Sequence, residues 1–128
     1  MALTRIIDSD GELLPIEFSE LPFIPERIFY VTGVPVNITR GNHAHYNTEQ
    51  ILFCVKGRIR LDLFDGIDRT TQILGPGKHT HVGNLIWDSQ TFLTPDAVLL
   101  SICSTKYNAS DYITDIDEFI AIINEKDK

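Results

Sequence analysis

Cysteine is scarce in this sequence, with two residues in a chain of 128. Cys54 and Cys103 each lie in an apolar run, and their spacing matches no redox or zinc motif. A chain of this length buries enough apolar surface to fold without disulfide bonds. We therefore expect two free thiols in the core and, since no secretory signal pattern occurs at the first residues, a cytoplasmic protein.

Long apolar segments and excess positive charge are also absent. No apolar run approaches the roughly 20 residues that a membrane-spanning helix requires. The formal net charge of -7 creates a field that repels polyanions. The sequence therefore predicts no membrane and no nucleic-acid partner. A small anionic ligand is still compatible, because one segment gathers five cations: Arg27, Arg40, Lys56, Arg58 and Arg60.

Short segments with the two-residue periodicity of β-strands fill most of the chain. An N-terminal hairpin is expected within residues 1–31, with arms at 5–7 and 14–18 around the turn at Asp8–Gly11. From residue 40 onward, strands recur about ten residues apart, which is typical of sandwiches and barrels. The apolar run 98–103 should be a central strand buried on both faces. This pattern indicates an all-β barrel over residues 27–105, within one domain of residues 1–128.

Only the C-terminal segment has helical periodicity. Apolar side chains recur there at three- and four-residue spacing, at Ile113, Ile116, Phe119, Ile120 and Ile123. We expect a helix over about residues 111–125, capped by Ser110 or Asp111 and packed on the outside of the barrel. The chain contains no internal repeat, low-complexity segment or linker.

The sequence His43-Ala44-His45 is the strongest candidate for chemistry. Residues two apart on a strand point the same way, so the two imidazoles would share one cavity. Such a pair can bind a transition metal, or it can move protons near neutral pH. The alternative is two polar residues near a loop. The second pair, His79 and His81, fits a solvated loop better, although His81 is a candidate for lining the pocket.

The segment from Arg40 to Gly57 resembles the first signature of the cupin barrels. Its elements are Arg40-Gly41-Asn42-His43-Ala44-His45, then Gln50, an apolar strand and a glycine turn. Metal-binding cupins place a glutamate near Gln50 and a third histidine in a later strand. Here Glu49 is the nearest carboxylate, and the residue after Trp87 is Asp88. The resemblance therefore implies a cupin, or jelly-roll, fold with no metal and no other cofactor.

A narrower resemblance, to the WxcM-like sugar 3,4-ketoisomerases of the cupin superfamily, covers nearly the whole chain. The matching elements are Arg27-Ile28-Phe29-Tyr30, Arg40-Gly41-x-His43-Ala44-His45, Gln50, Tyr107, Asp111-Tyr112-Ile113 and Asp117-Glu118-Phe119. It implies an isomerase that moves the carbonyl of a dTDP-linked 4-keto-6-deoxyglucose from C4 to C3. It also implies a homodimer that exchanges N-terminal strands, and a role in making deoxysugars for bacterial surface polysaccharides such as lipopolysaccharide.

A carbonyl shift between adjacent carbons needs a base for the proton on carbon and a donor for the developing oxygen. We expect His43 and His45 to divide these two roles, in an order that the residues leave open. Guanidinium groups hold phosphate oxygens in pairs, which makes two arginines candidates for the pyrophosphate. The full set expected to bind the nucleotide-linked sugar is Arg27, Tyr30, Arg40, Gln50, Arg60 and His81.

Two other functions fit the same residues. A metal-dependent cupin enzyme would contain bound iron, manganese or zinc and would lose activity to chelators. A non-catalytic cupin would bind the sugar nucleotide tightly without turning it over.

Overall fold

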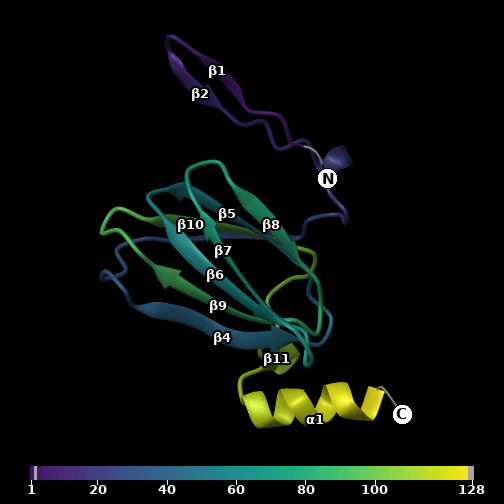
Figure 1. The fold of residues 1–128 in the computed structure, drawn as a ribbon. Coiled ribbons are helices and arrows are strands. Elements are labelled where there is room, and N and C mark those ends of the chain that lie inside the picture. The colour runs from purple at the N-terminus through teal and green to yellow at the C-terminus, as the bar shows by residue number, and fades with distance from the viewer. Residues whose placement is uncertain (2, 127–128) are drawn as a thin grey trace.

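Two antiparallel sheets face each other in the computed structural model, which describes residues 1 and 3–126 (Figure 1). The first has the order β3-β10-β5-β8, made of Arg27–Val31, Val98–Cys103, Gln50–Lys56 and His79–Val82. The second has the order β11-β4-β9-β6-β7, made of Tyr112–Ile113, Thr39–His45, Trp87–Phe92, Ile59–Phe64 and Arg69–Leu74. With one C-terminal helix, this is the expected jelly-roll barrel.

Alternating side chains explain why these segments form strands. On β6, Ile59 and Leu61 are buried between the sheets, whereas Arg60 is exposed on the outer face. The main core contains Leu52, Cys54, Ile59, Leu61, Leu74, Phe92 and Leu99. Cys54 and Cys103 are both buried and free, as predicted.

The strand β10 lies between β3 and β5, which confirms the central place expected for residues 98–103. Four of its six residues are buried, and Leu100 is half-buried on the outer face. Among the described residues, no helix has the length and apolar character needed to span a membrane.

The C-terminal helix begins later than the sequence indicated. Helix α1 covers Ile116–Lys126, and the Asp115 carboxylate caps it by accepting hydrogen bonds from the backbone N–H of Asp117 and Glu118, at 2.8 and 3.1 Å. The expected first turn is instead a 3-10 turn, Ala109–Asp111, followed by β11. Asp111 is therefore not the cap, because its carboxylate bonds to the β4 strand and the loop after it. The helix does pack outside the barrel, as expected (Figure 1).

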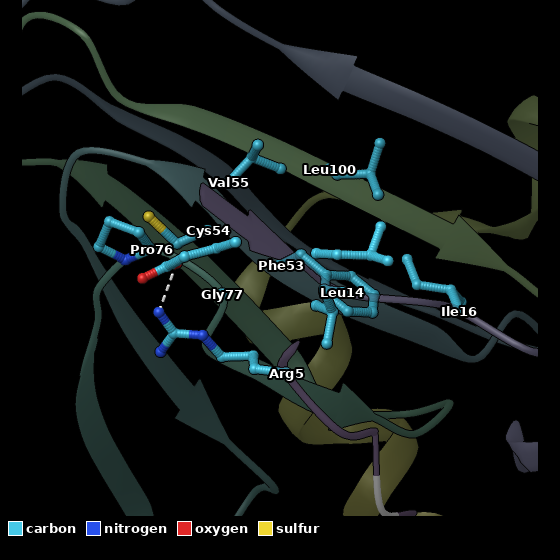
Figure 2. Close-up of a pocket in the computed structure, with 11 residues that line it drawn as sticks. Arg5, Leu14, Ile16, Phe53, Cys54, Val55, Pro76, Gly77 and Leu100 are labelled. Carbon is cyan, nitrogen blue, oxygen red and sulfur yellow. Dashed lines mark hydrogen bonds and ion pairs between the residues drawn. The ribbon is translucent and has the colours of Figure 1, made fainter. Parts of the chain in front are cut away.

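The N-terminal hairpin is present but shorter than predicted. Its strands are β1, Ile6–Asp8, and β2, Gly11–Leu13, and residues 14–17 leave the ladder before a 3-10 turn at Phe18–Glu20. Leu14 and Ile16 pack on the outer face of the first sheet, against Phe53 and its neighbours (Figure 2). The hairpin and helix α1 lie on opposite sides of the barrel (Figure 1).

Phe119 anchors helix α1 to the second sheet, so its removal should destabilise the protein. The ring is completely buried, with its centroid 5.9 Å from that of Phe64 and 5.7 Å from that of Trp87. We expect Phe119→Ala to lower the free energy of unfolding by about 3–5 kcal/mol. The exposed control Asn124→Ala should change it by less than about 0.5 kcal/mol. Urea titrations of both variants measure this difference, and equal midpoints would contradict the assigned packing.

Candidate active site

A cavity of about 460 Å³ opens between the two sheets. Its polar lining comes from both sheets and from the segment after β10, and includes Arg27, Arg40, His43, Gln50, Gln90, Tyr107 and Tyr112. The remaining lining is mostly apolar, from Phe29, Val31, Leu52 and Leu99. A few convergent polar groups in an apolar setting are typical of small-molecule sites.

A β-bulge in β4 sets the direction of the histidines. The register with β9 shifts between Gly41 and His43, and both Gly41 and Asn42 have positive φ, 83° and 56°. A Cβ on Gly41 would lie 2.9 Å from Nε2 of Gln90, so only glycine fits here without displacement. After the bulge, His43 and His45 lie on one face, with ring centroids 5.0 Å apart and nearly perpendicular.

The hydrogen bond of His43 fixes its tautomer. Its Nδ1 lies 3.1 Å from the carbonyl oxygen of Gly41, which can only accept, so Nδ1 carries the hydrogen and Nε2 keeps a lone pair. Burial, together with a smaller effect of the neighbouring His45, lowers the pKa of His43 to about 4. His43 is therefore neutral at pH 7, with a lone pair available to act as a base.

His45 has a different partner. Its Nδ1 lies 3.1 Å from Oδ2 of Asp111, and its Nε2 is buried with no hydrogen-bond partner among the described residues. Burial lowers the pKa of His45, although the Asp111 carboxylate acts in the opposite direction. Burial also disfavours ionised Asp111, but hydrogen bonds from Thr48, Asn47 and His45 outweigh it and hold the pKa of Asp111 below its usual value. His45 thus faces a carboxylate that is negatively charged at neutral pH.

Two tyrosines complete the wall beside the histidines. The Tyr112 ring centroid lies 5.1 Å from that of His43 and 4.4 Å from that of His45. Tyr107 lies 5.8 Å from Tyr112, and the Arg27 guanidinium is 5.6 Å from the Tyr107 ring centroid. These aromatic faces restrict the rotation of both imidazoles and hold a cation at the cavity wall.

Two residues of the cavity lining, Gln50 and Arg27, each have one buried polar atom without a hydrogen-bond partner among the described residues. Gln50 donates from Nε2 to Oγ of Ser101 at 3.1 Å, which leaves its buried Oε1 unpaired. Nε of Arg27 is also buried and unpaired. Because buried polar groups normally find partners, these atoms are suited to a polar ligand in the cavity.

The structure brings together five of the residues expected from the sequence: Arg27, Arg40, His43, His45 and Gln50. It places the other three outside the cavity. Tyr30 is 70% exposed on the outer face of the edge strand β3. Arg60 donates from Nε to the Asp62 carboxylate at 3.1 Å on the outer face of the second sheet. His81 pairs with Glu49 at 2.8 Å on the outer face of the first sheet.

The sequence indicated no site role for five residues that line the cavity or lie beside the histidines: Asp88, Gln90, Tyr107, Asp111 and Tyr112. Asp88 and Gln90 lie in a run of four consecutive polar residues in β9, which shows no alternation and therefore gave no signal of which side chains face inward. The described residues contain no group of three or more His, Cys, Asp or Glu side chains that could hold a metal ion.

Comparisons with known proteins agree with this geometry. The family model described as FdtA, WxcM-like, C-terminal, matches residues 1–124. A TDP-4-oxo-6-deoxy-alpha-D-glucose-3,4-oxoisomerase of Aneurinibacillus thermoaerophilus is 35% identical over 125 residues, which cover 94% of this chain and 90% of that protein.

Two solved structures of one enzyme are also similar. QdtA, a sugar 3,4-ketoisomerase from Thermoanaerobacterium thermosaccharolyticum in complex with TDP, has a TM-score of 0.91 and 32% identity, covering 97% of this chain and 92% of QdtA. A mutant of QdtA in complex with TDP-4-keto-6-deoxyglucose has a TM-score of 0.92 and 31% identity, covering 97% and 91%.

The Asp111 carboxylate favours the protonated form of His45, so its removal should lower the pKa of that imidazole. We expect Asp111→Asn to shift the His45 titration to lower pH, because the amide carries no charge. NMR titration of the ring nitrogens measures this shift. Asp115→Asn, a change in the helix cap, is the matched control and should leave the His45 titration in place. An unchanged His45 titration in Asp111→Asn would contradict the pairing.

Proposed function

The chain belongs to the FdtA family of WxcM-like, C-terminal domains, and on this basis we propose that it is a sugar 3,4-ketoisomerase acting on a TDP-linked 4-keto-6-deoxy sugar. The observation that carries the proposal is the pair of imidazoles beside one cavity, each with Nδ1 bonded to a protein acceptor and Nε2 without a close partner. Relatives of similar length are named for this reaction.

His43 is our candidate for the base. Its neutral Nε2 would remove the proton from C3, the electrons of that C–H bond would form a C3=C4 double bond, and the C4 oxygen would take a proton to give an enediol. In the second half, the C3 hydroxyl would lose its proton as the C3 carbonyl forms, and C4 would receive a proton. No oxidant or cofactor is needed, because one hydrogen has moved between carbons and one between oxygens.

His45 is our candidate for the proton on oxygen. Its ring is held through Nδ1 by the ionised Asp111, which stabilises an imidazolium whenever Nε2 gains a proton. A carboxylate that orients an imidazole in this way is a recurrent feature of acid-base catalysis. The two histidines therefore have different electrostatic partners, a backbone carbonyl for His43 and a carboxylate for His45.

Arg27 and Arg40 are our candidates for the pyrophosphate of the substrate. Both line the cavity, and the chain as a whole carries a net charge of -7, which repels an anion elsewhere on the molecule. Gln50, with its unpaired Oε1, is placed to accept a hydrogen bond from a sugar hydroxyl. Arg60, Tyr30 and His81 have no place in this proposal, because each lies on an outer face.

We also propose that two copies form a homodimer through their N-terminal hairpins. All six strand residues of the hairpin are exposed, including Ile6, Ile7 and Leu13. The outer face of the first sheet exposes Ile28, Tyr30 and Val55 as well. Apolar side chains exposed on both a projecting hairpin and a sheet face favour association, and exchange of hairpins between identical chains would cover both.

Loss of either cavity histidine should abolish most turnover. We expect His43→Asn and His45→Asn each to lower kcat by about 100- to 10,000-fold, the usual contribution of an acid or base. Incubation with TDP-4-keto-6-deoxyglucose in deuterated water, followed by NMR, would measure both the displaced ketone and the label at C3 and C4. The matched control is His81→Asn on the outer face, which should keep wild-type turnover. Full activity in a cavity variant would remove that histidine from the mechanism.

Charges placed on the hairpin should separate the dimer. We expect the wild-type chain to have twice the monomer mass in light scattering, and the double variant Ile7→Glu, Leu13→Glu to have the monomer mass. Ile67→Glu is the control, because Ile67 is exposed elsewhere on the barrel. A wild-type monomer would refute the dimer, whereas a dimeric double variant would refute only the role of the hairpin.

A further inference from the structure

Asp88 is a completely buried carboxyl group on β9, next to the candidate base. Its Oδ1 accepts a hydrogen bond from Nε2 of Gln90. Its Oδ2 has no hydrogen-bond partner among the described residues, and Nε2 of His43 lies 4.0 Å away, beyond hydrogen-bond distance. The mechanism above makes no use of this group.

The surroundings of Asp88 provide little to stabilise a negative charge. On β6 its register partner is the apolar Leu63, while Arg60 and Asp62 bond to each other on the outer face. On β4 the facing residues are Gly41 and His43, the latter neutral at pH 7. The remaining charged or titratable groups of this region lie in or beside the cavity wall. They are Arg27, Arg40, His45, Tyr107 and Tyr112.

An ionised carboxylate at this position would lose its hydration without gaining a cation as a partner. A buried acid in that situation keeps its proton, because the neutral form is far cheaper to bury than the ion. Burial accordingly raises the pKa of Asp88 to about 7, even though the bond from Gln90 acts in the opposite direction. Geometry and electrostatics therefore agree on an acid that keeps its proton below about pH 7.

We propose that Asp88 is a positioning residue for the isomerisation, whose carboxyl group must carry its proton for His43 to act as the base. This inference rests on the proposed function. The neutral acid leaves the lone pair of His43 Nε2 free for the substrate. An ionised Asp88 would attract a proton onto that nitrogen and would also repel the negative charge that develops on the substrate oxygens. Turnover should therefore fall as the pH rises and Asp88 ionises.

The isosteric variant Asp88→Asn tests this role, because the amide resembles the neutral acid but cannot ionise. In the wild-type enzyme we expect kcat to fall about 50-fold between pH 7 and pH 9, as for a single ionisation near pH 7. In Asp88→Asn this alkaline decline should shrink to about threefold or less, with turnover at pH 6 within about tenfold of wild type. Ser89→Ala, which changes the adjacent outward-facing residue, is the control and should keep the wild-type profile.

Three kinetic results would overturn the proposal: a wild-type enzyme without an alkaline decline, the same decline in Asp88→Asn, or a folded Asp88→Asn that is inactive at every pH. A second measurement needs neither turnover nor a variant. Carbon NMR of aspartate-labelled wild-type protein should contain one carboxyl that titrates near pH 7, and complete ionisation of all aspartates at pH 6 would also overturn the proposal. If the wild-type protein shows no turnover, the proposed function fails, while this titration still decides the state of Asp88.

Discussion

The Asp111 carboxylate connects the end of the chain to the reactive strand, and the site depends on this connection. It accepts hydrogen bonds from Nδ1 of His45, from the backbone N–H of Asn47 and Thr48, and from the Thr48 hydroxyl. The same segment continues as β11, whose Tyr112 pairs with His45 in the ladder and packs against both imidazoles. One carboxylate thereby fixes the tautomer of His45, the path of the chain toward α1 and the aromatic wall of the cavity.

The two histidines differ because their surroundings differ. Both rings are buried, which disfavours the charged form of each. His45 faces an ionised carboxylate, whereas His43 faces a carbonyl oxygen on one side and the unpaired Asp88 on the other. Acid and base roles are usually divided between neighbouring groups whose surroundings give them different pKa values. The sequence contains the pair but not this asymmetry, because Asp88 and Asp111 are distant from it along the chain.

Local patterns predicted most of the strands and the histidine pair. The central strand expected at 98–103 matches β10, because apolar content identifies buried strands well. The C-terminal segment was harder to predict from local patterns. Asp111 precedes an apolar helical pattern and so has the sequence features of an N-cap, yet its bonds to residues 45–48 are long-range contacts. Such contacts override local preference and leave no signal in one sequence.

Strand register explains why three predicted site residues, Tyr30, Arg60 and His81, lie outside the cavity. Residues opposite each other in an antiparallel ladder share a face, so one inward residue determines the face of its partners. Cys103 pairs with both Arg27 and Gln50, and these three residues face inward. Leu100 pairs with Tyr30 on one side and with Phe53 on the other, and these three lie on the outer face.

The same rule accounts for His81 and Arg60. His81 pairs with Ile51, which packs on the outer face beneath the N-terminal segment. Arg60 pairs with Thr91, while His43 pairs with Asp88 and Asp88 with Leu63 on the opposite face. The identity of a residue suggests what it can bind, but only the register decides whether it reaches the cavity. With the histidines taken as inward, the pairing of β4 with β9 is sufficient to place Asp88 beside them.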